Sequence, residues 1–320
     1  MPVPKIVFLD QDTIPAHIAL PTLSVEHQWQ SYPATSRDQV VERLQGAKVA
    51  IVNKVVLDEA LLSQLPDLTM IAVAATGYNN VDIAACQAMG ITVCNIRGYA
   101  TRSVPEHVIA MLLALKRNLK GYHQDIAKGV WQQGGHFCFF THPIQDMAGS
   151  TLGIIGSGEL GQATANLVKA LGVNVVFAER KGAKHCRQGF LPFEQVLSMA
   201  DAISLHCPLN EDTHHLIGED ELALMPKHSI LINAGRGGLV DEHALVSALK
   251  QQHIAGAGMD VFTQEPAPSD HVLLAHQALP NLLLTPHVAW GSDSAIAKLT
   301  GILFDNIDAF LSGTPQNVVV

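Results

Sequence analysis

The sequence predicts an α/β protein of two doubly wound domains, each built on a parallel sheet. Three observations lead to this prediction: the chain is long enough for two domains, its short apolar runs are continuous, and longer helix-like stretches separate them. The 320 residues are 48% hydrophobic and 15% charged, which is enough apolar material for two cores and unlike a disordered chain. Alternation of strands and helices favours right-handed crossover units with helices on both faces of each sheet.

The expected strands fall into two sets. The first contains residues 6–9, 49–52, 70–75 and 91–94, and the second contains 152–155, 173–178, 202–205, 230–232, 257–261 and 282–284. Continuous runs of Val, Ile and Leu are typical of strands that are buried on both faces. A strongly helical stretch at 103–119 separates the two sets, and an amphipathic stretch at 292–311 is expected to cover a sheet face.

The segment 120–146 is rich in Gln, Gly and aromatic residues and carries few helix or strand signals. We interpret it as an excursion from the domain body that serves as a dimer arm. The alternative is a plain surface loop, which is less favourable because several aromatic side chains would be exposed to water. These aromatic residues are Trp131, Phe137, Phe139 and Phe140.

Composition excludes several classes of partner. The net charge is −9, from 20 basic and 29 acidic residues, and no run of Lys or Arg could follow a phosphate backbone, so nucleic acid is not expected as a partner. The five cysteines are odd in number and lack CxxC spacing, which favours reduced thiols in the cytoplasm over disulfides or a metal site. The apolar runs are too short for a signal peptide or a membrane span, so no membrane association is expected.

A glycine-rich turn is the clearest motif. The pattern GxGxxG at 156–161 follows an apolar strand directly and opens an amphipathic helix. Gly156 would permit the tight turn, Gly158 would let a pyrophosphate approach the backbone, and Gly161 would let helix and strand pack closely. With Glu159 and Leu160 it forms the expected binding site for a dinucleotide, whose phosphates would meet the helix N-terminus. The alternative is a glycine turn that only packs.

Glu179 narrows the choice of dinucleotide. It ends the strand after the glycine turn, at the distance along the chain where a carboxylate often holds the ribose hydroxyls. Because its charge would repel a 2′-phosphate, NAD is favoured over NADP. Arg180 and Lys181 follow immediately and could pair with that phosphate instead, which leaves NADP as the less favoured alternative.

Later strands of the second set end in polar side chains. Arg236, Asp260 and His287 each lie at or just after such a strand end, and Glu265 lies in the loop beyond Asp260. In open α/β sheets this edge binds ligands. Arg236 could hold a carboxylate through two hydrogen bonds, His287 could exchange a proton with a keto oxygen, and Glu265 could orient the imidazole. Asp260 would contact the nicotinamide amide.

Each of these assignments has a simpler alternative. Arg236 could be a surface arginine in a turn, and any one of the 16 histidines is more often structural than catalytic. His287 differs from the others because it shares an expected sheet edge with Arg236 and Glu265. Together the three residues suit reduction of a small 2-keto acid by a nicotinamide dinucleotide.

On these and further motifs, the chain resembles the D-isomer-specific 2-hydroxyacid dehydrogenase family over nearly its full length. Besides GSGELG at 156–161, the matching segments are ATGYNNVD at 75–82, YATRSVPEH at 99–107, HCPL at 206–209, NAGRG at 233–237, the pair Asp260 and Glu265-Pro, and TPH at 285–287. The chain departs from the family pattern at Pro105, where alanine is usual, and at Glu179, where aspartate is commoner.

The resemblance implies a flavodoxin-like substrate-binding domain made of residues 1–99 plus 290–320. A Rossmann NAD-binding domain, 100–289, would be inserted between these two parts. It further implies a homodimer whose interface includes the helix and arm at about 103–146. It supports Arg236, Glu265 and His287 as the catalytic set.

The resemblance also implies binding residues outside the glycine turn. Further cofactor contacts are Thr101, Arg180, Cys207, Pro208, Thr213, Asn233, Ala234 and Gly235, with Asp260 and His287. Substrate contacts are Asn53, Ala75, Thr76, Gly77, Tyr78 and Trp290, with Arg236 and His287. The loop 75–79 would hold the substrate carboxylate through backbone N–H groups, whereas Trp290 could equally be ordinary packing.

Within the family, segments 137–140, 179–183 and 287–290 look most like those of bacterial glycerate dehydrogenases, also called hydroxypyruvate reductases. The expected activity is therefore NADH-dependent reduction of hydroxypyruvate or glyoxylate. Two alternatives remain open: a 3-phosphoglycerate dehydrogenase, and a dinucleotide-sensing binding protein like the corepressors that share this fold.

Overall fold

The computed structural model describes residues 3–320, and the chain divides into two compact units. One unit, called here the terminal unit, joins the first hundred residues to Gly291–Val320; the other, the central unit, is Thr101–Trp290. Each unit contains one sheet whose strands all pair in parallel. The predicted fold class, two parallel-sheet α/β domains, is confirmed.

The sheet of the terminal unit has the strand order β2-β1-β3-β4-β5, which is the flavodoxin-like order. Its strands are β1 (Lys5–Phe8), β2 (Gln28–Ser31), β3 (Val49–Val52), β4 (Met70–Val73) and β5 (Thr92–Cys94). Its helices are α1 (Val40–Leu44), α2 (Glu59–Leu62), α3 (Ile83–Met89) and α12 (Asp293–Leu311), with short 3₁₀ helices at Gln11–Thr13 and Arg37–Gln39. The residues of β3 and β4 are buried throughout, as their unbroken apolar sequences predict.

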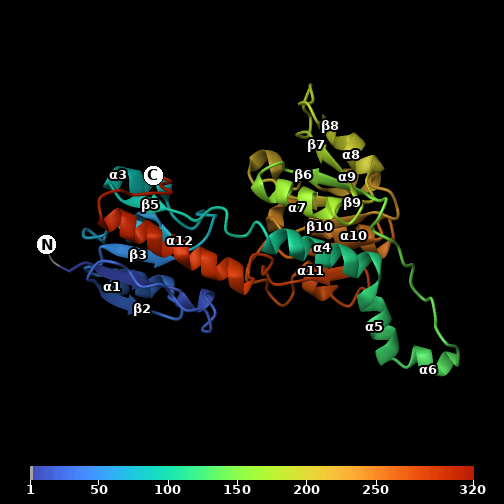
Figure 1. The fold of residues 1–320 in the computed structure, drawn as a ribbon, viewed down its shortest axis with the longest axis horizontal. Helices are drawn as coiled ribbons and strands as arrows, with labels where there is room; N and C mark the ends of the chain where they lie inside the picture. Colours follow the sequence, from blue (N-terminus) through green and yellow to red (C-terminus); the bar gives the residue numbers. More distant parts are fainter. Residues whose placement is uncertain (1–2) are drawn as a thin grey trace. The chain divides into compact units, whose positions relative to one another are not determined.

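The C-terminal part of the chain completes the terminal unit. Helix α12, red in Figure 1, lies against β4, and the Ser292 hydroxyl caps its first turn by accepting a hydrogen bond from the N–H of Ala295. The last residues then run beside β5, where the N–H of Val93 donates to the carbonyl of Val320 at 2.7 Å. The two ends of the sequence therefore share one sheet and one core.

The sheet of the central unit has the strand order β12-β11-β10-β9-β6-β7-β8, a Rossmann order with one added strand. Its strands are β6 (Thr151–Ile155), β7 (Asn174–Ala178), β8 (Phe190–Leu191), β9 (Ala202–Leu205), β10 (Ile230–Asn233), β11 (Gly256–Met259) and β12 (Leu282–Leu284). Its helices are α4 (Ser103–Lys116), α5 (Leu119–Ala127), α6 (Val130–Gly134), α7 (Glu159–Lys169), α8 (Phe193–Met199), α9 (Glu219–Leu224), α10 (Glu242–Lys250) and α11 (Val272–Ala275), with 3₁₀ helices at Glu211–Thr213 and Gly237–Leu239.

Helices pack on this sheet in two groups. Helices α8 to α11 share one core with strand residues such as Leu205 and Leu231. Helix α4 lies against β10, β11 and α7, and Met111 of α4 sits so close to Gly258 that a Cβ there would be 3.0 Å from its sulfur. Among the helices of residues 3–320, none is long and apolar enough to span a bilayer.

The structure differs from the sequence-based expectation in two respects. Strands β2 and β8 were not predicted, because both are edge strands and neither is a buried apolar run. The segment 120–146, which carries few helix signals in the sequence, contains most of α5 and all of α6. The segment 139–142 folds back on α5, where the Tyr122 hydroxyl donates to the carbonyl of His142 at 2.7 Å.

Candidate active site

The turn between β6 and α7 has the geometry that its glycines predict. Gly156 has φ = +103°, and a Cβ there would lie 2.5 Å from the backbone nitrogen of Cys207. A Cβ on Gly161 would lie 2.0 Å from the carbonyl oxygen of Gly156, whereas a Cβ on Gly158 would meet nothing within 4 Å. The turn therefore leaves open space at Gly158, beside the N–H groups that begin α7, and this is a suitable place for a phosphate.

The loop after β9 lies beside this turn. The N–H of His206 donates to the carbonyl of Ile155, and the Thr213 hydroxyl donates to the carbonyl of Pro208 at 2.8 Å. Burial raises the pKa of the Cys207 thiol to about 11, so this thiol stays protonated at neutral pH. The predicted cofactor contacts Cys207 and Pro208 are thus held next to the glycine turn, and Thr213 braces them.

Glu179 lies at the end of β7, but its carboxylate is turned into its own loop. One oxygen accepts from the backbone N–H of Arg180 and from Nη2 of Arg187, both at 2.9 Å; the other accepts from the backbone N–H and Nε of Arg187 at 3.0 and 2.7 Å. The hydrogen bonds from Arg187 lower the pKa of the Glu179 carboxyl to about 2. Lys181 is paired with Glu221 at 2.7 Å. Arg187 was missed by the sequence analysis because no motif marks it.

The turn that carries Arg236 is shaped by Asn233. This buried side chain accepts a hydrogen bond from the N–H of Gly235 at 3.1 Å and donates to the carbonyl of Arg236 at 2.8 Å. A Cβ on Gly237 would lie 2.0 Å from the carbonyl oxygen of Phe262, so the Arg236 turn runs directly against the chain that leads to Glu265. The guanidinium of Arg236 is exposed.

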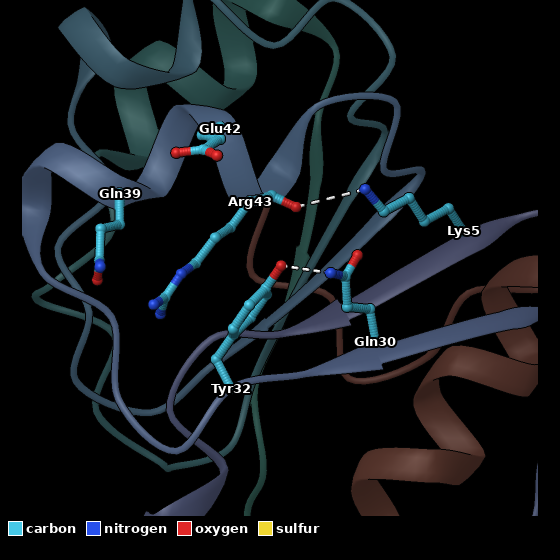
Figure 2. Close-up of a pocket in the computed structure, with 6 residues that line it drawn as sticks. All are labelled: Lys5, Gln30, Tyr32, Gln39, Glu42 and Arg43. Carbon is cyan, nitrogen blue, oxygen red and sulfur yellow. Dashed lines mark hydrogen bonds between the residues drawn. The ribbon is translucent and has the colours of Figure 1, made fainter.

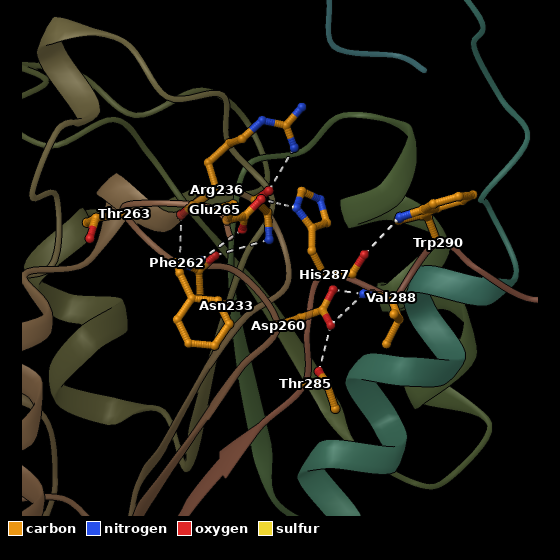
Figure 3. A network of polar contacts seen from close by, with 12 residues as sticks. Asn233, Arg236, Asp260, Phe262, Thr263, Glu265, Thr285, His287, Val288 and Trp290 are labelled. Carbon is orange, nitrogen blue, oxygen red and sulfur yellow. Dashed lines mark hydrogen bonds and ion pairs between the residues drawn. The ribbon is translucent and has the colours of Figure 1, made fainter. Parts of the chain in front are cut away.

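His287 and Glu265 form a close pair. Nδ1 of His287 lies 2.6 Å from Oε2 of Glu265, while Oε1 accepts from the N–H of Phe262 at 3.0 Å. The imidazole is a quarter exposed. Because Nδ1 faces the carboxylate, Nε2 is the nitrogen that can exchange a proton with a ligand. The predicted residues Arg236, Glu265 and His287 are brought together at one edge of the sheet (Figure 3).

Asp260 supports this pair from inside the protein. One carboxylate oxygen accepts from the Thr285 hydroxyl at 2.6 Å and from the N–H of Val288 at 2.9 Å; the other accepts from the N–H of Ala289 at 2.9 Å. The Asp260 side chain is fully buried. Asp260 therefore fixes the turn after β12, as Figure 3 shows. Its contact with the nicotinamide amide stays a prediction.

Trp290 holds the same turn through its indole N–H, which donates to the carbonyl of His287 at 2.9 Å. His107 of α4 adds to the support, since its Nε2 lies 3.0 Å from the Thr285 hydroxyl. Substrate contact by Trp290 stays a prediction. Thr101 and Ala234, two further predicted cofactor contacts, are both partly exposed.

A second acidic residue braces the loop that carries Glu265. Glu242, in the first turn of α10, is 4% exposed. Its oxygens accept from the N–H of Thr263 at 2.9 Å and from its hydroxyl at 2.7 Å, and Nε2 of His271 lies 3.1 Å away. Glu242 and His271 were missed because only the folded path of the 262–271 loop brings them together at Thr263.

The predicted substrate residues of the terminal unit lie in loops after β3 and β4. The carboxylate of Asp10 accepts from the N–H groups of Asn53, Lys54 and Val55, which orders the first loop. In the second loop, the hydroxyl of Thr76 donates to the carbonyl of Ile96 at 2.7 Å.

The backbone N–H groups of the loop after β4 are placed to take an external acceptor. Within residues 3–320, the backbone N–H groups of 76–78 donate to no protein atom. A run of successive N–H groups of this kind suits a carboxylate.

A hollow of 420 Å³ on the terminal unit contains none of the predicted site residues; Lys5, Gln30, Tyr32, Gln39, Glu42 and Arg43 line it (Figure 2). Its two cations brace the chain itself. Arg43 donates to the carbonyl of Ala34 at 2.6 Å and stacks 4.0 Å above the Tyr32 ring, and Lys5 donates to the carbonyl of Gln45 at 2.8 Å. We assign it no ligand.

The class of protein follows from the Rossmann sheet with its glycine turn and from the polar strand ends beside it: the protein is an oxidoreductase of the nicotinamide-dependent dehydrogenase class. Its family is that of the D-isomer specific 2-hydroxyacid dehydrogenases, to which this chain belongs. The model of that family's NAD binding domain matches residues 109–289. The resemblance recognised from the motifs is therefore confirmed.

Known relatives agree with this assignment along the whole chain. A glycerate dehydrogenase of Methylorubrum extorquens is 47% identical, with 98% of each chain covered. A putative 2-hydroxyacid dehydrogenase of Haemophilus influenzae is also 47% identical, covering 98% of this chain and 99% of that protein. Among solved structures, the TT0316 protein of Thermus thermophilus superposes with a TM-score of 0.84 at 30% identity, covering 99% of this chain and 100% of that one.

Proposed function

We propose that this protein is a glycerate dehydrogenase that reduces hydroxypyruvate with NADH, and glyoxylate more slowly. The observation that carries the proposal is the His287–Glu265 pair at 2.6 Å on strand ends that also present Arg236. The 47% identical glycerate dehydrogenase supports this substrate class. The terminal unit, taken as residues 1–99 plus 290–320, would bind the substrate, and 100–289 would bind the cofactor.

The cofactor fits the central unit because the Gly158 position is open and faces the start of α7. The glycine turn would hold the pyrophosphate, and the remaining contacts would come from Thr101, Cys207, Pro208, Thr213, Ala234 and Gly235. When bound, NADH supplies a hydride to the keto carbon. The protein's own task is to bind and polarise the keto acid and to move one proton.

Arg236 would bind the substrate carboxylate through the two arms of its guanidinium and draw electron density from the adjacent carbonyl. Carboxylate binding by the backbone N–H groups of 76–78 stays a prediction. Nε2 of His287 would donate a proton to the keto oxygen as the carbon is reduced, and would take it back in the reverse reaction. Glu265, at Nδ1, would stabilise the imidazolium and keep the ring in place.

A panel of keto acids with NADH tests this proposal. We expect the highest kcat/KM with hydroxypyruvate and lower values with glyoxylate and pyruvate. A preference for 3-phosphohydroxypyruvate would move the assignment to a 3-phosphoglycerate dehydrogenase. No turnover of any keto acid, with NADH still bound, would instead support a dinucleotide-sensing protein.

The proposal includes a homodimer in the cytoplasm. The five cysteines are all free in the structure, which suits a reducing compartment. Exposed apolar side chains on α5, α6 and the segment that follows them support an interface there.

A further inference from the structure

The adenosine end of the cofactor site departs from the simple rule that a free carboxylate selects NAD. A carboxylate has about four acceptor sites, and Glu179 accepts four hydrogen bonds: one from the backbone N–H of Arg180, and three from the backbone and side chain of Arg187. Its side chain is 5% exposed. Ribose hydroxyls could use this carboxylate only by displacing Arg187.

Arg187 is arranged to face a ligand. Two of its guanidinium nitrogens, Nε and Nη2, donate to Glu179, and a guanidinium has five N–H groups, so most of its donors stay available. Its Cζ lies 3.9 Å above the Phe190 ring of β8, which fixes the plane of the group. The side chain is 54% exposed, so its outer edge is accessible.

The charges around Glu179 do not exclude an anionic ligand. Arg187 neutralises Glu179, which stays ionised because its pKa is held near 2. Arg180, next in the chain, is exposed. Lys181 is paired with Glu221 on α9, so the other basic residues of this loop that could meet a phosphate are Arg180, Lys184 and Arg187.

We propose that Arg187 is a cofactor-specificity residue: by occupying Glu179 and presenting a stacked guanidinium, it lets the site accept the 2′-phosphate of NADP, so that the protein can use NADP as well as NAD. This inference rests on the proposed dinucleotide-dependent function and widens its cofactor range. A bidentate guanidinium suits phosphate recognition, and a nearby arginine is how Rossmann domains accommodate this group.

Binding measurements with two fragments test the proposal without turnover. Adenosine 2′,5′-bisphosphate and AMP differ only in the 2′-phosphate and can be titrated by calorimetry. In the unaltered protein we expect the bisphosphate to bind at least as tightly as AMP. In Arg187→Ala the ratio of the two affinities should fall about tenfold, as expected for loss of a charge-assisted pair. Lys181→Gln is the matched control and should leave the ratio unchanged.

Kinetics with NADH and NADPH give the second readout. The ratio of kcat/KM for NADPH over NADH should fall about tenfold in Arg187→Ala. If the alanine variant loses AMP affinity as well, the ratio of the two affinities still decides, because both fragments share every contact except those of the 2′-phosphate. An unchanged ratio in Arg187→Ala, or rejection of the bisphosphate by the unaltered protein, overturns the proposal. If the unaltered protein binds neither NADH nor NADPH, the proposed function itself is wrong.

Discussion

At the scale of single residues, the position of His287 depends on a buried carboxylate. Asp260 accepts two backbone N–H groups from Val288 and Ala289 and the Thr285 hydroxyl. In Asp260→Asn, an amide NH₂ would face a donor, which leaves a buried N–H or hydroxyl unpaired at a cost of about 2 kcal/mol. We expect the variant to lose about that much stability and to lower kcat at least tenfold.

Two measurements distinguish positioning by Asp260 from simple support of the fold. The pH profile of kcat/KM should shift in Asp260→Asn, because the imidazole moves relative to Glu265. His287→Gln is the comparison: it should abolish turnover while leaving melting temperature and NADH affinity close to their original values. An Asp260→Asn protein that is less stable but has an unaltered pH profile would contradict the positioning role.

His206 makes stability depend on pH. Its Nε2 lies 2.9 Å from the Ser204 hydroxyl, and burial lowers its pKa from 6.5 to about 4. The unfolded chain therefore binds this proton more readily than the folded protein, so stability is lost as pH falls from 6.5 to 4, by up to about 1.4 kcal/mol per pH unit. Urea unfolding at several pH values should show a flatter dependence in His206→Gln. The exposed His243 of α10 gives the control, and an equal slope in both variants would refute the role of His206.

At the scale of the elements, the glycine turn offers a matched pair of substitutions. A Cβ at Gly161 would lie 2.0 Å from the backbone oxygen of Gly156, while a Cβ at Gly158 would point into open space. We expect Gly161→Ala to destabilise the protein by about 2–3 kcal/mol through overpacking. Gly158→Ala should keep its melting temperature and weaken NADH binding, because the methyl group would occupy the space assigned to the pyrophosphate. Equal stability of the two variants would contradict the close packing inferred at Gly161.

The elements also show how far the sequence predicts the fold. Buried strands such as β3 and β10 were found because both faces are covered and the apolar run is unbroken. Strand β2, Gln28–Ser31, was not, because it lies at an edge with a mostly exposed face. Helix α5 depends on tertiary contacts that the pattern does not contain: Lys120 donates to the carbonyls of Leu279 and Leu282 at 2.9 and 2.7 Å.

At the scale of the whole molecule, the candidate site divides into a part that the sequence predicts and a part that only the fold reveals. Arg236, Glu265 and His287 were found because parallel strands place their carboxyl ends at one edge. Glu242, His271 and Arg187 were not, because their roles follow from where loops return after leaving the sheet. The residues that were not predicted fix the position or the hydrogen bonding of the predicted site. Arg187, for example, donates two side-chain hydrogen bonds to Glu179.

A second copy of the chain is expected to bind at the arm that contains α5 and α6. The arm 119–146 exposes apolar side chains that an isolated chain would leave in water: Leu119, Ile126, Trp131, Phe137, Phe140 and Ile144 are 41–93% exposed. A patch of this kind on one element suits a second copy of the chain. The double variant Phe137→Asp and Phe140→Asp, at the two most exposed positions, should shift the protein from dimer to monomer in sedimentation velocity at micromolar concentration. Met89→Asp, at a side chain 39% exposed on α3, should stay dimeric. A monomeric unaltered protein, or a dimeric double variant, would show that the arm has another role.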